Sequence, residues 1–137
     1  MSDKKRVMRL GAFLHGVGHH IASWRHESSN PQLVRSLEAY VAMTQTAERG
    51  CFDMIFLPDN LSVREENPKA LRHVSDYIVQ FEPLSLLCAL AAVSKNIGLV
   101  ATASTSYNEP YHLARRLASL DHLSNGRAGW NLVTSTT

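Results

Sequence analysis

The chain has 137 residues, enough for one domain or part of one, and 45% of them are hydrophobic, as in an ordinary globular protein. Lys and Arg number 14 against 12 Asp and Glu, so the net charge of +2 is too small to indicate a nucleic-acid surface. No apolar segment approaches the ~20 residues that cross a bilayer, and the N-terminus lacks the apolar core of a secretory signal. Cys51 and Cys88 lie in no metal-type or redox-type pair, which predicts two buried free thiols. We therefore expect a cytoplasmic protein with no nucleic-acid or membrane partner.

The first half of the chain predicts two strands with a helix between them. Residues 7–14 form an apolar run that fits a first strand, and a loop rich in His and Gly follows at residues 15–31. Residues 33–49 repeat apolar side chains at spacings of three and four, which is typical of an amphipathic helix, and Gly50 ends it. Residues 52–57 are a short apolar run before a proline and predict the second strand.

The second half continues the alternation after a polar stretch at residues 61–81, which predicts a long loop. Residues 82–95 are apolar almost all round, as in a heavily buried helix. A third strand is predicted at residues 97–105, a third helix at 110–125 and a fourth strand at 128–133. This β-α-β-α-β-α-β order indicates an α/β fold with parallel strands joined by right-handed crossovers.

Such an order fits either a small open sheet or the first half of an eight-stranded barrel of ~250 residues. Both architectures bind ligands beside the carboxyl ends of their strands. Polar side chains stand at or just after the ends of predicted strands two, three and four: Asp59, Thr102, Asn131, Thr134 and Ser135. They predict one shared polar site, although Pro58-Asp59-Asn60 is also ordinary turn chemistry and leaves a capping role open for Asp59.

Two sharper interpretations of the first loop are less favoured. His15, His19 and His20 resemble a metal-ligand cluster, but Gly16 and Gly18 disfavour the helix that the four-residue spacing needs. We therefore predict no metal site and expect these side chains to line a pocket. The same stretch lacks the G-x-G-x-x-G fingerprint of a phosphate-binding loop.

Several long motifs carry a resemblance to a known family. The stretches "STSYNEPYHLARR", "LDHLSNGRAGWN" and "VTS", together with "FDMIFLPD" and Trp24-Arg25-His26, resemble the bacterial luciferase-like flavin monooxygenases. The match looks strongest to the branch of nitrilotriacetate, dibenzothiophene-sulfone and pristinamycin-synthase monooxygenases, and it covers essentially the whole chain.

This resemblance implies a (β/α)8 barrel with an FMN site at the carboxyl end of its strands. It implies that a separate NAD(P)H:flavin reductase supplies reduced FMN. The enzyme would then use the reduced FMN and O2 to oxidise a small organic substrate. The flavin would react with O2, while the protein would orient the reactants. A deazaflavin-dependent oxidoreductase of the same fold is an alternative, and the full-length protein is expected to be a homo-oligomer.

The resemblance also implies roles for individual residues. Asp59 matches the carboxylate or amide that lies at the flavin after strand two, and Thr102 matches a strand-three hydroxyl at the isoalloxazine. Thr134 and Ser135 match strand-four hydroxyls beside the flavin, and Asn131 is a further cofactor-binding candidate. His19 falls in the first-strand loop, where some members place a histidine of the substrate pocket; the catalytic residues are not assigned.

Three other side chains have two interpretations each. Arg115 and Arg116 either bind phosphate or lie on a solvated helix face, paired with Asp121 or Glu109, and the outer position of the helix favours the second. Trp130 either stacks on flavin or packs in the core, and a strand tryptophan is more often a core residue.

Family members are longer than this chain, which predicts that residues 1–137 are a single truncated domain containing strands one to four. A half-barrel has two open edges, and open edges favour pairing or aggregation. The alternative to an enzyme is therefore a non-catalytic half-barrel that associates through these edges.

Overall fold

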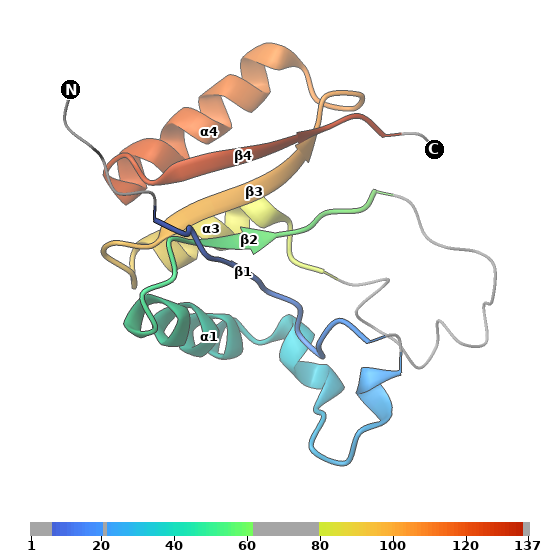
Figure 1. Ribbon diagram of the computed structural model, residues 1–137. Helices are drawn as coiled ribbons and strands as arrows, with labels where there is room; N and C mark the ends of the chain where they lie inside the picture. The colour runs from blue at the N-terminus through green and yellow to red at the C-terminus, as the bar shows by residue number, and fades with distance from the viewer. Residues whose placement is uncertain (1–6, 21, 62–79, 136–137) are drawn as a thin grey trace.

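Four parallel strands form one sheet in the order β1-β2-β3-β4 (Figure 1). The structure is a computed structural model that describes residues 7–20, 22–61 and 80–135. The strands are β1 (Gly11–Phe13), β2 (Met54–Leu57), β3 (Gly98–Ser104) and β4 (Ala128–Val133). The spatial order thus repeats the sequence order, with no reversal.

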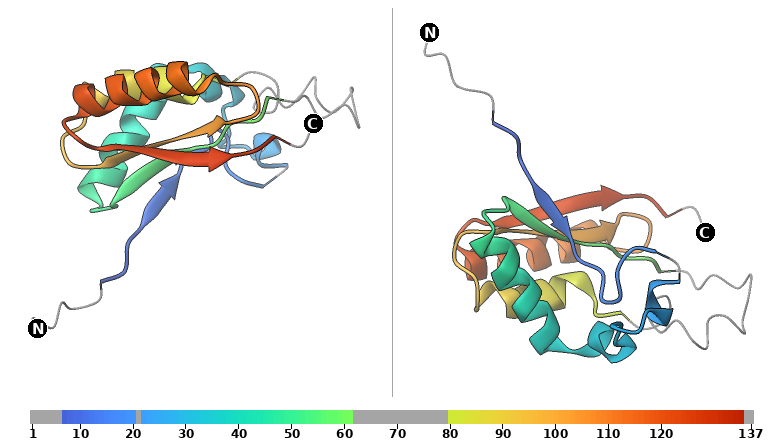
Figure 2. Two further views of the ribbon diagram at one scale, coloured as in Figure 1. Left: turned by 90° about the horizontal axis from the view of Figure 1, so that it is seen from above. Right: turned by 60° about the horizontal axis from the view of Figure 1, so that its bottom comes forward.

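The α-helices of the described residues cover the same face of this sheet, and none of them lies on the other face, here called the bare face (Figure 2). They are α1 (Leu37–Arg49), α3 (Pro83–Ala91) and α4 (Pro110–Ser124). A sheet that winds steadily in one direction with its helices on one side has the geometry of a (β/α)8 barrel, whereas a doubly wound open sheet reverses its strand order and carries helices on both faces. The predicted α/β half-barrel is confirmed, and the small open sheet is not the arrangement formed.

Strand alternation assigns each side chain of β3 to one of these two faces. Leu99, Ala101 and Ala103 are buried against the helices. The alternate residues of β3, among them Thr102 and Ser104, point to the bare face, which in a closed barrel is the inner face. Polar residues in the half of β3 nearest its carboxyl end therefore belong to the inside of the barrel.

Several predicted boundaries move for local reasons. β1 is only three residues long, within the expected 7–14. The helix expected from residue 33 begins at Leu37, because the Ser36 hydroxyl accepts from the Ala39 amide at 3.2 Å and caps it. A separate 3-10 helix, η2 (Pro31–Arg35), precedes this cap and is itself capped by Asn30. α3 ends at Ala91, four residues before the predicted end. The predicted loop at 61–81 lies almost wholly outside the described residues.

The amino ends of the strands are tied together by one arginine. Nε of Arg127 donates to the Ser124 carbonyl at 2.7 Å, and its two Nη atoms donate to groups at the end of α3 and in the turn after it. These acceptors are the carbonyls of Ala91, Ser94 and Ile97 and the hydroxyl of Ser94, at 2.7–3.3 Å. All five guanidinium N–H groups therefore have acceptors, and two helix C-termini receive a positive charge.

Glu48 supports the same end of the sheet. Its Oε1 accepts from the backbone amides of Lys95, Asn96 and Ile97 at 2.9, 2.5 and 3.1 Å. These bonds hold the turn that leads into β3. In a barrel, this end contributes to stability, while the opposite end carries the chemistry.

The two cysteines differ in their exposure. Both cysteines are free, but Cys51 is exposed and only Cys88 is partly buried, so the expected burial of Cys51 is wrong. Cys51 sits at positive φ in the turn after α1, which places its side chain outside the core. In the described part of the chain, no helix is long and apolar enough to span a membrane.

Candidate functional site

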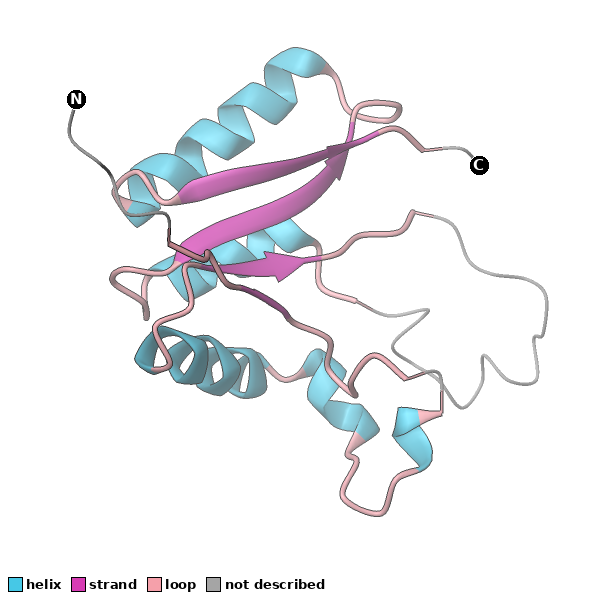
Figure 3. Ribbon diagram, in the orientation of Figure 1, coloured by secondary structure: helices cyan, strands magenta, loops and turns pink. Residues whose placement is uncertain are grey.

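The loops that follow β1 and β3 lie at the same end of the sheet as the chain segment that follows β4 (Figure 3). Three of the predicted polar residues of strands three and four, Thr102, Asn131 and Ser135, lie on the bare face toward this end. Thr102 and Asn131 are direct partners in the parallel register of β3 and β4. Nδ2 of Asn131 donates to the Thr102 hydroxyl at 3.1 Å, and Thr102 is only 5% exposed. The Thr102 O–H and the Asn131 Oδ1 keep hydrogen-bonding capacity toward the inner side of the sheet.

A second pair of hydroxyls lies beyond the first, toward the mouth. The hydroxyls of Ser104 and Ser135 are 2.7 Å apart. Ser104 Oγ also accepts from the Ser106 amide at 3.1 Å, and Ser106 Oγ accepts from the Ser135 amide at 3.0 Å. The ends of β3 and β4 are thus joined side chain to side chain, which fixes Ser135 beside the strand-three polar groups.

Ser104 and Ser106 are members of this cluster that sequence reasoning did not select. The signal for Ser104 is the two-residue period, because the residue two after Thr102 must share its face. Ser106 lies beyond the strand, where no periodicity applies, so only the folded loop shows its contact.

Thr134 does not join this cluster. It is exposed, and no hydrogen bond connects it to another residue in the described ranges. It alternates with Val133 and Ser135, so its hydroxyl points away from the side that Ser135 shares with Ser104.

Asp59 lies just after β2 at the same end and is partly buried. Burial raises the pKa of its carboxyl above the ordinary aspartate value, and the nearby negative charge of Glu82 raises it further. The Asn60 backbone amide acts in the opposite direction. Asp59 therefore takes up a proton more readily than an exposed aspartate.

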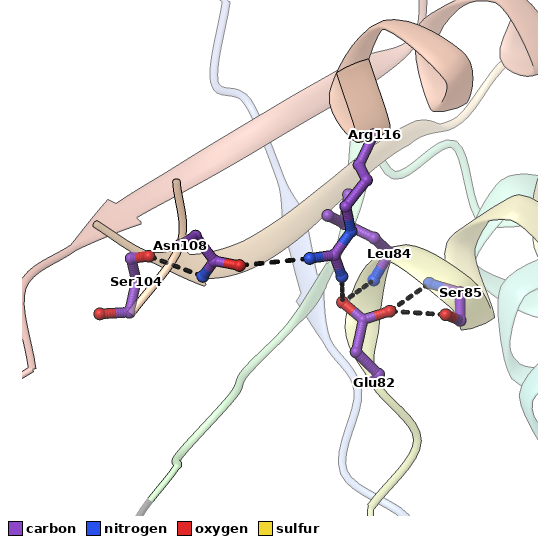
Figure 4. A network of polar contacts seen from close by, with 6 residues as sticks. All are labelled: Glu82, Leu84, Ser85, Ser104, Asn108 and Arg116. Atoms are coloured by element: carbon purple, nitrogen blue, oxygen red, sulfur yellow. Dashed lines mark hydrogen bonds and ion pairs between the residues drawn. The ribbon is translucent and has the colours of Figure 1, made fainter. Parts of the chain in front are cut away.

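Glu82 belongs to a chain of polar contacts that runs from α3 to β3 (Figure 4). Its carboxylate caps α3 by accepting from the amides of Leu84 and Ser85, at 3.1 and 2.7 Å. It also forms a 2.8 Å ion pair with Nη2 of Arg116 on α4. Partial burial by itself would raise the pKa of Glu82, but the hydrogen bonds from Ser85 and Leu84 and the charge of Arg116 together hold this pKa below its usual value.

Arg116 extends the chain toward the strand end. Its Nη1 donates to Asn108 Oδ1 at 3.2 Å, and Asn108 Nδ2 donates to the Ser104 carbonyl at 2.8 Å. The solvated or paired interpretation of Arg116 is thus the correct one, but its partner is Glu82 and not Asp121 or Glu109. Sequence reasoning missed this pair because Glu82 and Arg116 are far apart in the chain and belong to different helices.

His19 is exposed and lies at the end of β1, away from the β3–β4 cluster. Its Nε2 is 3.0 Å from the Phe13 carbonyl oxygen, and its ring meets the Phe13 ring edge-on at 4.6 Å between centroids. The His15 ring lies 5.4 Å from it. In the parts of the chain that are described, no group of three or more His, Cys, Asp or Glu side chains is placed to hold a metal ion.

Trp130 is on the helix side of β4. Its strand partner Ala101 is a buried core residue, and Nε1 of Trp130 donates to the Ala103 carbonyl at 3.0 Å. The ring lines a small hollow with Pro110 and Leu113 of α4. It therefore faces away from Asn131 and is not placed to stack on a ligand at the inner face.

Comparison with known proteins identifies the family. A model of the luciferase-like monooxygenase family matches residues 12–137, and the chain belongs to this family. N-acetyl-S-(2-succino)cysteine monooxygenase of Bacillus subtilis (strain 168) is 52% identical over 99% of the chain and 30% of its own length. Nitrilotriacetate monooxygenase component A of Aminobacter aminovorans is 43% identical over 95% of the chain and 30% of its own length. The predicted branch of the family is confirmed by these relatives.

Solved structures agree. EDTA monooxygenase from Chelativorans sp. BNC1 superposes with a TM-score of 0.84 at 36% identity, over 96% of this chain and 31% of that one. The 137 residues thus span about 30% of the length of these relatives.

Proposed function

We propose that this chain supplies strands one to four of a flavin-dependent monooxygenase barrel and one wall of its reduced FMN site. The observation that carries the proposal is the pairing of Asn131 with Thr102 on the inner face, at 3.1 Å. An isoalloxazine ring has carbonyl and N–H groups along one edge, and it needs donors and acceptors held at fixed positions. The Thr102 O–H and Asn131 Oδ1 are such groups, and both are held by rigid strands.

Three further residues would complete this wall. Ser135 is fixed beside Ser104 by the 2.7 Å hydroxyl contact, and Asp59 would contribute its carboxyl group from the segment that follows β2. Thr134 would contact the flavin only from the outer rim, because it does not share the face of Ser135. When bound, reduced FMN would supply the reaction with O2, and these side chains would orient the ring and limit the access of water.

We propose that a separate reductase provides the reduced flavin. One relative is named as component A of its monooxygenase, and the chain also matches subunits A and B of pristinamycin IIA synthase. Such names support an enzyme whose oxygenase acts together with another polypeptide.

The substrate would be a small organic compound. Relatives are named for N-acetyl-S-(2-succino)cysteine, nitrilotriacetate and EDTA, which all carry several carboxylates. Others are named for dimethyl sulfide and long-chain alkane, so family membership alone leaves the substrate open.

The test is O2 consumption by the protein at the full length that its coding sequence gives, with a flavin reductase and NADH regenerating the flavin. We expect substrate-dependent O2 uptake with FMN, tested on N-acetyl-S-(2-succino)cysteine and nitrilotriacetate. A parallel assay with a reduced deazaflavin separates the alternative cofactor. Tight deazaflavin binding without FMN binding would contradict the proposal, and so would a protein that binds neither cofactor.

A further inference from the structure

The loop between β1 and α1 encloses an open hollow of about 710 Å³, at some distance from the β3–β4 cluster. Its lining includes His20, Ser23, Arg25, His26 and Ser29. The proposed flavin wall uses none of these residues. Most of the exposed lining is apolar, its one charged side chain is Arg25, and it contains no Asp or Glu.

Local hydrogen bonds fix how the two histidines face the hollow. The Ala22 amide donates to Nδ1 of His20 at 3.1 Å, and the Ser28 amide donates to Nδ1 of His26 at 3.2 Å. A ring nitrogen that accepts a hydrogen bond carries no proton, so in both neutral rings the proton is on Nε2. Within the described ranges no acceptor lies opposite either Nε2–H. Both histidines thus offer a donor of fixed tautomer.

Arg25 adds a full positive charge to the same lining. It ends the 3-10 helix η1 (Ser23–Arg25), and its guanidinium carbon lies 5.9 Å from the centroid of the Trp24 ring. No carboxylate or carbonyl of the described residues accepts from this guanidinium. An arginine that rests on an aromatic ring with its N–H groups unused is well suited to bind a carboxylate through two parallel hydrogen bonds.

Two packing features support a formed site. Ser29 Oγ is enclosed in the same wall and has no hydrogen-bond partner in the described part of the chain. Gly16 also lines the hollow, and a Cβ there would lie 2.8 Å from the Cα of Val34, which is fully buried in η2. The loop is therefore packed tightly onto η2 at Gly16, which fixes this part of the wall.

We propose that this hollow is an anion subsite that binds a carboxylate group of the substrate through Arg25, His20 and His26. The inference rests on the proposed function for its role, because a substrate that reaches from this loop to the flavin wall would be anchored here at one carboxylate. Its chemical basis is independent of the flavin, since the donors and their geometry belong to this loop alone. The substrate class is thus a small compound with at least one carboxylate distant from the reacting centre.

The test is calorimetric titration of citrate into the full-length protein without flavin, compared with uncharged trimethyl citrate. We expect citrate to bind and trimethyl citrate not to bind. Arg25→Gln should weaken citrate binding at least tenfold, because it removes a charge-assisted bidentate contact. His20→Asn and His26→Asn should each weaken it several-fold, since asparagine can still accept from the backbone amide two residues on but lacks the Nε2–H.

Arg35→Gln is the matched control, because Arg35 is an exposed arginine of η2 that does not line the hollow. It loses the same charge and should bind citrate as the unaltered protein does. Citrate binding that is equal in Arg25→Gln and Arg35→Gln would overturn the proposal, as would equal binding of the neutral ester. FMN affinity is measured alongside: normal FMN binding with failed citrate binding contradicts the anion subsite alone, and the reverse contradicts the flavin assignment alone.

Discussion

Arg116 and Glu82 form an ion pair of 2.8 Å that joins α4 to the N-terminal end of α3. Both side chains are more than a third exposed, so the pair itself contributes less than about 1 kcal/mol to stability. Its importance is positional, because Arg116 also holds Asn108 against the Ser104 carbonyl. A structural link thus runs from two outer helices to the proposed flavin wall.

Arg116→Gln is therefore expected to weaken FMN binding about 3- to 10-fold while lowering stability little. Arg115→Gln is the control, since Arg115 is the exposed neighbour whose guanidinium lies near the Tyr111 ring and makes no contact with Asn108. Fluorescence titration of FMN and thermal unfolding give the two readouts. Equal FMN affinity in the two variants would show that the contacts of Arg116 do not affect the flavin site.

Arg127→Lys should destabilise the protein by about 2 kcal/mol. Lysine has three donors without the planar fork of arginine, so it leaves some of the buried carbonyls at the ends of α3 and α4 without partners. Denaturant unfolding measures the change, with Arg49→Lys on the exposed end of α1 as the control. A loss below about 0.5 kcal/mol would show that water replaces these bonds at little cost.

Glu48→Gln should lower stability by about 1 kcal/mol at neutral pH, because the amide oxygen is a weaker acceptor for three backbone amides than a carboxylate. The hydrogen bond from the Asn96 amide is the largest cause that lowers the pKa of Glu48 in the folded state. A lowered folded pKa means that the stabilisation is present above the ordinary glutamate pKa and is lost as the pH falls through the folded value. The stability difference between the two proteins should therefore shrink on acidification, and a difference that grows would contradict the assignment.

Asp59→Asn should act in the opposite direction. Burial raises the pKa of Asp59 in the folded state, so its contribution is fully favourable below the unfolded pKa and is lost as the pH rises through the folded pKa. The variant should be more stable than the unaltered protein at pH 7, with the difference disappearing below the ordinary range of aspartate. Unfolding curves at several pH values check this. FMN titration of the same variant shows whether the carboxyl group that lowers stability also contributes to flavin binding.

The fold could be predicted from the sequence because the apolar residues recur with the spacing of helices or strands, and Gly and Pro mark the turns between these elements. β4 has the predicted limits, because the turn at Gly126 precedes its start and the apolar run ends at Val133. The start of α1 was missed because Ser36, a capping residue, lies inside a continuous apolar pattern that begins at residue 33. The preference of serine for the capping position therefore determined where α1 begins, and the apolar periodicity did not.

The site was predicted less completely, for a different physical reason. Thr102, Asn131 and Ser135 follow from strand ends, and the structure brings Asn131 onto Thr102 and Ser135 onto Ser104. The contacts of Glu82 with Arg116 depend on how two helices pack, and no pattern within one helix contains that information. The tautomers of His20 and His26 likewise depend on loop conformation.

The most direct test of the flavin wall is anaerobic titration of reduced FMN against Thr102→Val and Thr105→Val in the full-length protein. Both changes replace a hydroxyl by a methyl group of similar size, but Thr105 is exposed and lies next to the mouth with its hydroxyl on the Val133 carbonyl, outside the pair with Asn131. We predict five- to tenfold weaker binding, or about 1 kcal/mol, for Thr102→Val and unchanged binding for Thr105→Val. Equal affinity in the two variants would contradict this prediction and place the flavin elsewhere.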